Sequence, residues 1–204
     1  MPKRVDHRER RTQIADALMR VAAEHGLEAV SLRHVAAEAG VSAGMVQHYF
    51  RTKDEMMTFA LSVVREHNEA RVTAALTALG ATPSPRTLVR TMLGEVLPLD
   101  EPRRADGRVA LAFLAYTAVR PAVAASLHQD TAGLVDFIAG QIRAAQAAGG
   151  ARPEVDPDRA AVGLLALMEG LGVYLLGGHF PTDTALAALD AQLDLIFGPE
   201  EPAG

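Results

Sequence analysis

The sequence predicts an all-α protein, and three observations lead to this expectation. Apolar residues recur every three or four positions through most of the 204-residue chain, which is the spacing of one face of an α-helix. No segment shows the strict apolar and polar alternation that is typical of a half-buried strand. Proline and glycine divide the helical segments at intervals that suit ordinary helices. We therefore expect about nine helices, forming an N-terminal three-helix domain and a larger helical domain after it.

The first predicted helix ends at Gly26. Ile14, Leu18 and Val21 are spaced so that they face one core. Gly26 can adopt the left-handed backbone that commonly ends a helix. This helix supplies the first of the three helices of the N-terminal domain.

Two short amphipathic segments meet at a tight turn within residues 31–53. Gly40 suits the left-handed backbone of that turn, and Ser42 can cap the next helix by accepting a hydrogen bond from a backbone amide. Val46 and Phe50, at positions i and i+4, are predicted to bury the inner face of this helix. The arrangement is typical of a helix-turn-helix, in which the start of the second helix approaches base edges.

This segment resembles the DNA-binding motif of the tetracycline-repressor-like (TetR) family of transcriptional regulators. About twenty-three consecutive positions agree with the motif in type and spacing. Gln47 departs from it, because the family usually has a tyrosine there that contacts phosphate or base. Glutamine can instead form two hydrogen bonds with adenine. The matching residues are Arg33, Ala36, Ala39, Gly40, Val41, Ser42, Gly44, Val46, Tyr49, Phe50 and Lys53.

The motif contains nine candidate DNA contacts. Thr52 and Glu55 have the spacing of a capping box, which places Lys53 in the first turn of the next helix. A cation there opposes the helix dipole, whereas a phosphate bound at the free amides would favour it. The alternative is a solvated surface lysine. We expect phosphate or groove contacts from Arg33, Tyr49 and Lys53 and base contacts from the second helix. The candidates are Ser31, Arg33, Ser42, Ala43, Gly44, Gln47, His48, Tyr49 and Lys53.

Charge is unevenly distributed along the chain. Residues 1–53 hold nine Lys or Arg against six Asp or Glu, for a charge of +3, whereas residues 54–204 carry −8 and the whole chain −5. A basic module on an acidic body fits a protein that presents one face to phosphate. Residues 2–11 are expected to form a basic arm in which Lys3 or Arg4 either contacts DNA or stays solvated.

Residues 54–204 are predicted to form the second, larger domain, with the boundary at residue 53. It contains the segment LPLDEPRRADGRVALAFLAYTAVRPAV at 97–123 and AAQAAG at 144–149. With these segments it resembles the C-terminal domain of the betaine-inhibitor-like (BetI) branch of the TetR family. The resemblance implies ligand binding in this domain and dimerisation through its last two helices. The expected helices span 53–79, 85–98, 103–118, 121–148, 157–178 and 183–197.

The last two predicted helices contain candidates for a dimer interface. Three glycines recur every seven residues, and a glycine inside a helix costs about 1 kcal/mol relative to alanine. Close approach of another backbone would explain them, and packing within one subunit is the alternative. A twofold dimer would match a palindromic operator. The candidates are Gly163, Gly170, Gly177, Leu186, Leu189, Leu193 and Phe197.

Large or polar side chains on the inner faces of the same domain are candidates for an effector pocket. Glu169 lies in an apolar run and would be costly to bury unpaired, so it binds a ligand, pairs with an arginine or reaches solvent. The BetI resemblance raises a quaternary ammonium ligand, which prefers an aromatic cage. Because this half has few aromatic residues, a moderately apolar metabolite or drug is an equal expectation. The candidates are Met92, Phe113, Tyr116, Phe137, Met168, Glu169 and Tyr174.

Composition and motifs narrow the class of protein. The chain has no cysteine, which excludes disulfides and fits a reducing cytoplasm. No apolar run reaches the roughly 18 residues of a membrane span, and the N-terminus is too charged for a secretory signal, so we expect no membrane partner and a cytoplasmic location. Motifs for nucleophilic, metal-dependent and nucleotide-dependent catalysis are absent, and the histidines show no metal-ligand spacing. We expect neither an enzyme nor a cofactor.

The expected function is regulation of transcription. The favoured form is a homodimeric repressor that a small-molecule effector releases from a palindromic double-stranded DNA operator. Two alternatives stay open: an activator that uses the same DNA contacts, and a helical adaptor that binds proteins through its C-terminal domain.

Overall fold

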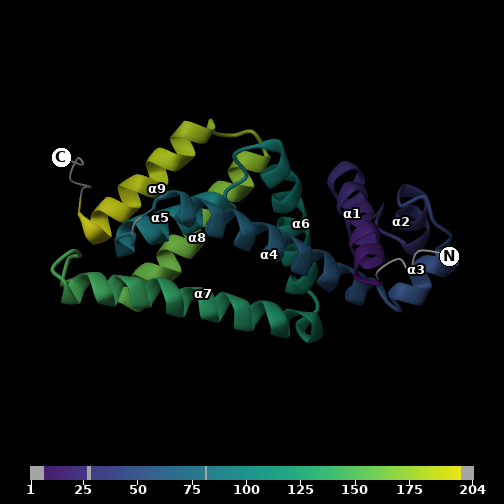
Figure 1. Cartoon of the computed structure of the whole chain (residues 1–204), viewed down its shortest axis with the longest axis horizontal. Coiled ribbons are helices and arrows are strands. Elements are labelled where there is room, and N and C mark those ends of the chain that lie inside the picture. The colour runs from purple at the N-terminus through teal and green to yellow at the C-terminus, as the bar shows by residue number, and fades with distance from the viewer. Residues whose placement is uncertain (1–6, 27–28, 81, 199–204) are drawn as a thin grey trace. The chain divides into compact units, whose positions relative to one another are not determined.

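The chain folds into α-helices, which confirms the predicted fold class. The structure, a computed structural model, describes residues 7–26, 29–80 and 82–198. Within these residues the helices, labelled in Figure 1, are α1 (His7–His25), α2 (Leu32–Glu38), α3 (Ala43–Tyr49), α4 (Lys53–Ala78), α5 (Pro85–Val96), α6 (Glu101–Ala118), α7 (Pro121–Ala147), α8 (Pro157–Leu176) and α9 (Thr182–Phe197).

Helix α1 begins at His7, so the predicted basic arm is wrong from that residue onward. Arginine and glutamate are good helix formers, and they continue the helix toward the N-terminus. Arg8 also forms an ion pair with Glu66, with 2.8 Å between Nη2 and Oε1. Lys3 and Arg4, the candidate contacts of the arm, lie outside the described residues.

Capping side chains determine where several helices begin. Ser84 caps α5 by accepting a hydrogen bond from the amide of Thr87. Helix α6 starts two residues earlier than predicted, because Asp100 accepts a hydrogen bond from the amide of Arg103 at 2.9 Å. Pro102 does not prevent this start. Backbone amides in the first turn have no hydrogen-bond partner within the helix, so the amide that proline lacks is not needed there.

By the packing of its helices, the chain forms two compact units. Unit 1 consists of residues 1–67 and 100–124, and unit 2 consists of residues 68–99 and 125–204. Helices α4 and α7 each contribute residues to both units. The functional division at residue 53 stays a prediction.

Unit 1 has a core built from α1 and the helices that pack against it. Helix α1 contacts α2 and α6, and α2 contacts α3. Every apolar position predicted for the inner faces of α1 and α3 is buried, which confirms the helical periodicity as the source of this core. The largest buried side chains of unit 1 are Ile14, Leu18, Phe50, Met56, Met57 and Phe113.

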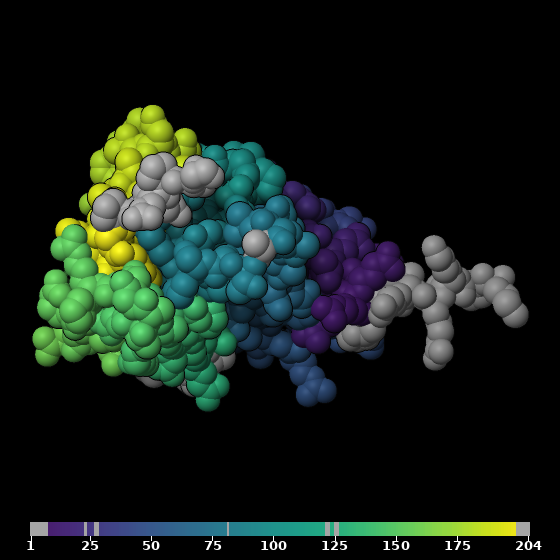
Figure 2. Space-filling view, turned by 60° about the vertical axis from the view of Figure 1, so that its left-hand side comes forward, coloured from purple at the N-terminus to yellow at the C-terminus, as the bar shows by residue number. Residues whose placement is uncertain are grey.

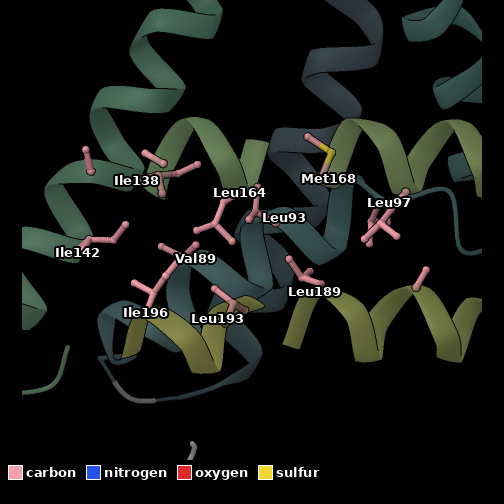
Figure 3. Close-up of a cluster of buried hydrophobic side chains, with 14 of the residues drawn as sticks. Val89, Leu93, Leu97, Ile138, Ile142, Leu164, Met168, Leu189, Leu193 and Ile196 are labelled. Carbon is pink, nitrogen blue, oxygen red and sulfur yellow. The ribbon is translucent and has the colours of Figure 1, made fainter. Parts of the chain in front are cut away.

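Unit 2 has a core to which α5, α7, α8 and α9 contribute. In Figure 3 the labelled side chains of α9 point toward those of α5 and α8. Leu189 and Leu193, which we predicted for a dimer interface, belong to this core and are 1% and 0% exposed. Their side chains therefore have no surface left for a second subunit, which corrects that assignment. The labelled residues are Val89, Leu93, Leu97, Ile138, Ile142, Leu164, Met168, Leu189, Leu193 and Ile196.

Helix α8 combines an apolar composition with incomplete burial. By length and composition it is the one helix in the described part of the chain that could cross a membrane, a weak indication that core helices share. Leu164 and Leu175 are fully buried in the core of unit 2, which accounts for one of its faces. Val162 and Val173 lie away from this buried face and are 55% and 43% exposed. The helix therefore has an apolar face that its own subunit does not cover.

The core of unit 2 yields a stability prediction. Leu164→Ala removes a fully buried side chain and should lower the free energy of unfolding by about 2–5 kcal/mol, because a cavity remains. Leu79→Ala is the matched control, since Leu79 is 46% exposed and should change stability by no more than about 0.5 kcal/mol. Urea unfolding followed by circular dichroism measures both. Equal losses would contradict the assignment of Leu164 to the core.

Candidate nucleic-acid interface

The turn between α2 and α3 depends on one glycine. Gly40 has φ of 66°, the left-handed conformation that the sequence predicted. The amide of Val41 donates to the carbonyl oxygen of Ala36 at 2.9 Å, which closes the end of α2. The turn therefore directs the chain into α3 without a buried unsatisfied amide at that position.

Helix α3 presents a polar and small-residue face to solvent. The hydroxyl of Ser42 caps the helix by accepting a hydrogen bond from the amide of Met45 at 3.1 Å. Val46 is fully buried and anchors the opposite face. The four residues predicted to contact bases are all exposed: Ala43, Gly44, Gln47 and His48. In Figure 2 this part of the chain, in blue, forms a surface beside the purple α1.

The start of α4 lies directly after this face. Thr52 caps α4 by accepting a hydrogen bond from the amide of Glu55 at 3.1 Å, as the capping box predicts. The Glu55 carboxylate reaches back to the amide of Arg51, one residue earlier than the motif requires. Lys53 is the first residue of α4 and is half-buried. Its position at a helix N-terminus suits a phosphate contact.

The other candidate contacts have defined positions around α2 and α3. Ser31 caps α2 by accepting a hydrogen bond from the amide of His34 at 3.2 Å. Arg33 is exposed in the first turn of α2. Tyr49, at the end of α3, contacts His48 edge-on, with 5.2 Å between the ring centroids. The structure thus places the nine candidates on α2 and α3, at the residues that cap the starts of these two helices, and at the first residue of α4.

Arg11 supports this interface and was missed in the sequence, where it was assigned to the arm. Its guanidinium lies over two neighbouring aromatic rings, 4.8 Å from the centroid of Phe50 and 4.4 Å from that of Phe59, and the two ring centroids are 5.5 Å apart. It also approaches Glu55, with 3.6 Å between Nη2 and Oε1. One signal was available: Arg11 continues the stripe of Ile14 and the later core residues of α1 back by three positions.

Helix α6 contributes to the same unit through Tyr116, a candidate for the effector pocket. Its hydroxyl donates a hydrogen bond to the carboxylate of Asp54, in the first turn of α4. The ammonium of Lys53 lies 5.8 Å from the centroid of its ring, and the guanidinium carbon of Arg120 lies 3.9 Å from it. Burial, then the hydrogen bond to Asp54, raises the pKa of the Tyr116 phenol. Phe113, another pocket candidate, is buried in the same unit.

The remaining pocket candidates lie in unit 2, so the structure divides the predicted set. Met168 belongs to the core of that unit, and Met92 packs against it. Phe137 is 42% exposed on α7, so it does not lie on the inner face that we expected. Tyr174 is half exposed, and its ring contacts those of His179 and Phe180. The pocket stays a prediction.

Glu169 is the remaining candidate, and it lies at the surface of α8. The residue is exposed, which agrees with the alternative that its side chain reaches solvent, and a ligand contact stays a prediction. Neighbouring groups nevertheless desolvate the carboxyl and raise the pKa of Glu169, although the residue as a whole is exposed.

The candidate interface glycines of α8 differ in their surroundings. A Cβ added at Gly163 or Gly170 would meet nothing within 4 Å. At Gly177, which follows the last residue of α8, a Cβ would lie 2.7 Å from the ring of His179. The chain itself therefore explains Gly177 but not the other two. Two further candidates, Leu186 and Phe197, are partly buried against the core of unit 2.

Unit 1 also has an open hollow between α1 and α6 that the sequence did not predict. Its volume is about 560 Å³, and Asp16 and Asp106 are among the acids that line it. His67 contacts Asp106, with 3.0 Å between Nδ1 and Oδ1. Burial raises the pKa of Asp16, against the nearby charge of Arg20. Its charged lining consists of four acids and two arginines, so the hollow is negative on balance: Asp16, Glu24, Glu101, Asp106, Arg20 and Arg108.

Comparison with known families agrees with this geometry. Residues 14–58 match the family of bacterial regulatory proteins named after TetR. Residues 85–198 match the C-terminal domain of BetI-type transcriptional repressors. The first match contains α2, α3 and the start of α4, and the second contains α5 to α9.

Individual relatives extend over most of the chain. The transcriptional regulator PksA of Bacillus subtilis is 33% identical over 177 residues, which are 86% of this chain and 83% of that protein. A transcriptional regulator from Rhodococcus sp. Rha1 has a TM-score of 0.78 and 33% identity, over 91% of this chain and 95% of that one. A regulator from Saccharomonospora viridis, solved with choline, has the same TM-score at 23% identity, over 92% and 96%.

Two glycines of the helix-turn-helix should respond oppositely to alanine. Gly40→Ala places a Cβ on left-handed backbone and should lower the free energy of unfolding by about 1–2 kcal/mol. Gly44→Ala is the matched control, because its Cβ meets only the Ser42 hydroxyl at 3.9 Å and helix propensity should raise stability by up to about 1 kcal/mol. Thermal unfolding measures both variants. A stabilising Gly40→Ala would contradict the geometry of the turn.

Proposed function

Because the chain belongs to the TetR family of DNA-binding transcriptional regulators, which are not enzymes, we propose that it is a homodimeric repressor released from a palindromic operator by a small-molecule effector. The observation that supports this most is the exposed outer face of α3, held by the Ser42 cap and followed at once by Lys53. We propose that the protein works in the cytoplasm, where its operator is accessible.

The DNA contacts divide by the chemistry of the side chains. Gln47 is exposed on α3 and can form two hydrogen bonds with the edge of an adenine, which specifies sequence. Gly44, one turn earlier, allows the backbone to approach a base closely. Lys53 and Arg33 contact phosphates, which determine the register of the protein on the duplex but not the sequence.

A second copy of the chain would cover the apolar face of α8. Val162 and Val173 are exposed there, and Gly163 and Gly170 have open space where a side chain would be. No neighbour within the subunit requires these two glycines, whereas a helix that crosses at close range would. A dimer formed in this way is twofold, and its paired α3 helices suit half-sites spaced by turns of the duplex.

The effector site is proposed for unit 2, which contains most of the BetI-type match. The aromatic contacts of Tyr174 with His179 and Phe180 provide rings on which a quaternary ammonium could rest. A moderately apolar metabolite remains the second candidate class. Glu169 and Tyr174 are exposed on α8, so a partner subunit would have to complete a pocket that uses them. The effector must bind the DNA-incompetent state more tightly, because only differential affinity shifts the equilibrium.

Footprinting on the DNA upstream of the protein's own gene tests the DNA contacts. Wild-type protein should protect a palindrome at moderate salt. Lys53→Ala should weaken binding to all sequences and reduce the slope of log affinity against log salt by about one, because one phosphate contact is lost. Gln47→Ala should instead relax preference at particular bases, with about tenfold loss on the best site only.

The matched control for charge is Arg143→Ala, which removes an exposed cation of unit 2 and should leave the slope unchanged. Absence of a protected palindrome would contradict the proposed function. Choline and apolar metabolites are added to the same footprint, and loss of protection by one of them identifies the class of the effector.

Transcription from the protected promoter distinguishes a repressor from an activator. Enhanced transcription would favour an activator.

Dimerisation has its own test on α8. Gly170→Leu should leave the monomer folded, since a Cβ at Gly170 meets nothing within 4 Å, but should shift the molar mass in sedimentation toward one chain. Gly133→Leu on α7 is the matched control, because its Cβ also meets open space and it lies outside the proposed interface. A Gly170→Leu variant that stays dimeric would exclude close packing at this position.

A further inference from the structure

We propose that Tyr116 is a positioning residue for DNA binding, which holds the Asp54 carboxylate away from the phosphate that Lys53 contacts. The inference rests on the proposed phosphate contact of Lys53. It assigns to a side chain of α6, sixty-three positions further along the chain, a role in the helix-turn-helix surface.

One acid and two cations surround the ring of Tyr116. The Tyr116 hydroxyl donates to Asp54, while the Lys53 ammonium lies 5.8 Å from the centre of the same ring. The Arg120 guanidinium lies closer, at 3.9 Å, and donates to the carbonyl oxygen of Tyr116 at 3.4 Å. Tyr116 itself is 8% exposed, so its orientation is fixed by packing.

Asp54 is the group that makes this contact relevant to DNA. An acid in the first turn stabilises α4 through the helix dipole, but a phosphate bound at Lys53 would use the same free amides. The carboxylate would then repel the phosphate across a short distance. A hydrogen bond from a phenol satisfies one carboxylate oxygen and directs it toward α6. A phenol is protonated at neutral pH, so its hydroxyl is a donor there, and burial and the Asp54 hydrogen bond raise the pKa of Tyr116 further.

Arg120 is the cation that contacts the Tyr116 ring most closely. Its guanidinium carbon lies 3.9 Å from the ring centroid, whereas the Lys53 ammonium lies 5.8 Å from it. Lys53 lies near the limit of about 6 Å at which a cation interacts appreciably with a ring. The contacts of the ring with Arg120 and Asp54 do not depend on Lys53, so the ring can stay in place when the ammonium turns toward a phosphate.

A double-mutant cycle on the full-length protein tests the inference, with the duplex protected in the footprint as the probe. Tyr116→Phe keeps the ring and removes the hydroxyl, and should weaken binding about fivefold and flatten the salt slope. In the Asp54→Asn background residue 54 has no carboxylate that could turn toward the phosphate. The same change should therefore alter the dissociation constant less than twofold. Phe113→Leu is the structural control, because it loosens the same helix without contacting Asp54, and its slope should match that of wild type.

Each outcome has a separate meaning. If Tyr116→Phe keeps the affinity and salt slope of the wild type, the inference is overturned. It is also overturned if Tyr116→Phe lowers the affinity equally in the wild-type and Asp54→Asn backgrounds. A Phe113→Leu variant that flattens the slope equally would reduce Tyr116 to a packing role and overturn it as well. If Lys53→Ala leaves the salt slope unchanged, the proposed phosphate contact itself fails, whatever Tyr116→Phe does. Thermal unfolding of each variant confirms that the compared proteins are folded.

Discussion

The geometry of unit 1 depends on the contact of the Arg11 guanidinium with Phe50 and Phe59, whose rings also contact each other. Phe50 ends α3, Phe59 lies on α4 and Arg11 belongs to the first turns of α1, so one guanidinium joins three elements of the DNA-facing unit. A planar cation can stack on aromatic faces and still reach the Glu55 carboxylate, which a lysine could not do in the same geometry. The orientation of α3 relative to α4 follows from this contact and from the burial of Val46.

The first turn of α4 shows how stability and binding make different demands on the same residues. Asp54 and Glu55 favour the helix N-terminus, while the charge of Lys53 opposes the helix dipole and would be favoured there by a bound anion. Glu55 is engaged by the amide of Arg51 and Asp54 by the hydroxyl of Tyr116. The acids that stabilise the helix are thus each oriented by a hydrogen-bond donor outside the first turn of α4.

Unit 2 shows a comparable division between the two faces of α8. One face supplies Leu164 and Leu175 to a core that also contains leucines of α9. The opposite face exposes Val162, Val173 and Glu169 and is interrupted by Gly163 and Gly170, for which the subunit offers no packing reason. Ion pairs between α5 and α9, such as Arg90 with Asp190, tie the edges of the same bundle. On α8 the predicted interface positions Gly163 and Gly170 lie away from this buried stripe, whereas on α9 Leu189 and Leu193 belong to the core.

Local patterns determined much of this protein. The spacing of apolar residues and the capping residues predicted the helices within a few positions, and the motif around Gly40 and Ser42 predicted the exposed face of α3, because both depend on neighbours in sequence. Only the tertiary structure decided which apolar stripe is core: Leu189 and Leu193 resemble interface residues until α5 and α8 cover them. It also placed Arg11 against Phe50 and Phe59, and Tyr116 beside Asp54 at the start of α4. These contacts join helices distant in the chain, and no local spacing encodes them.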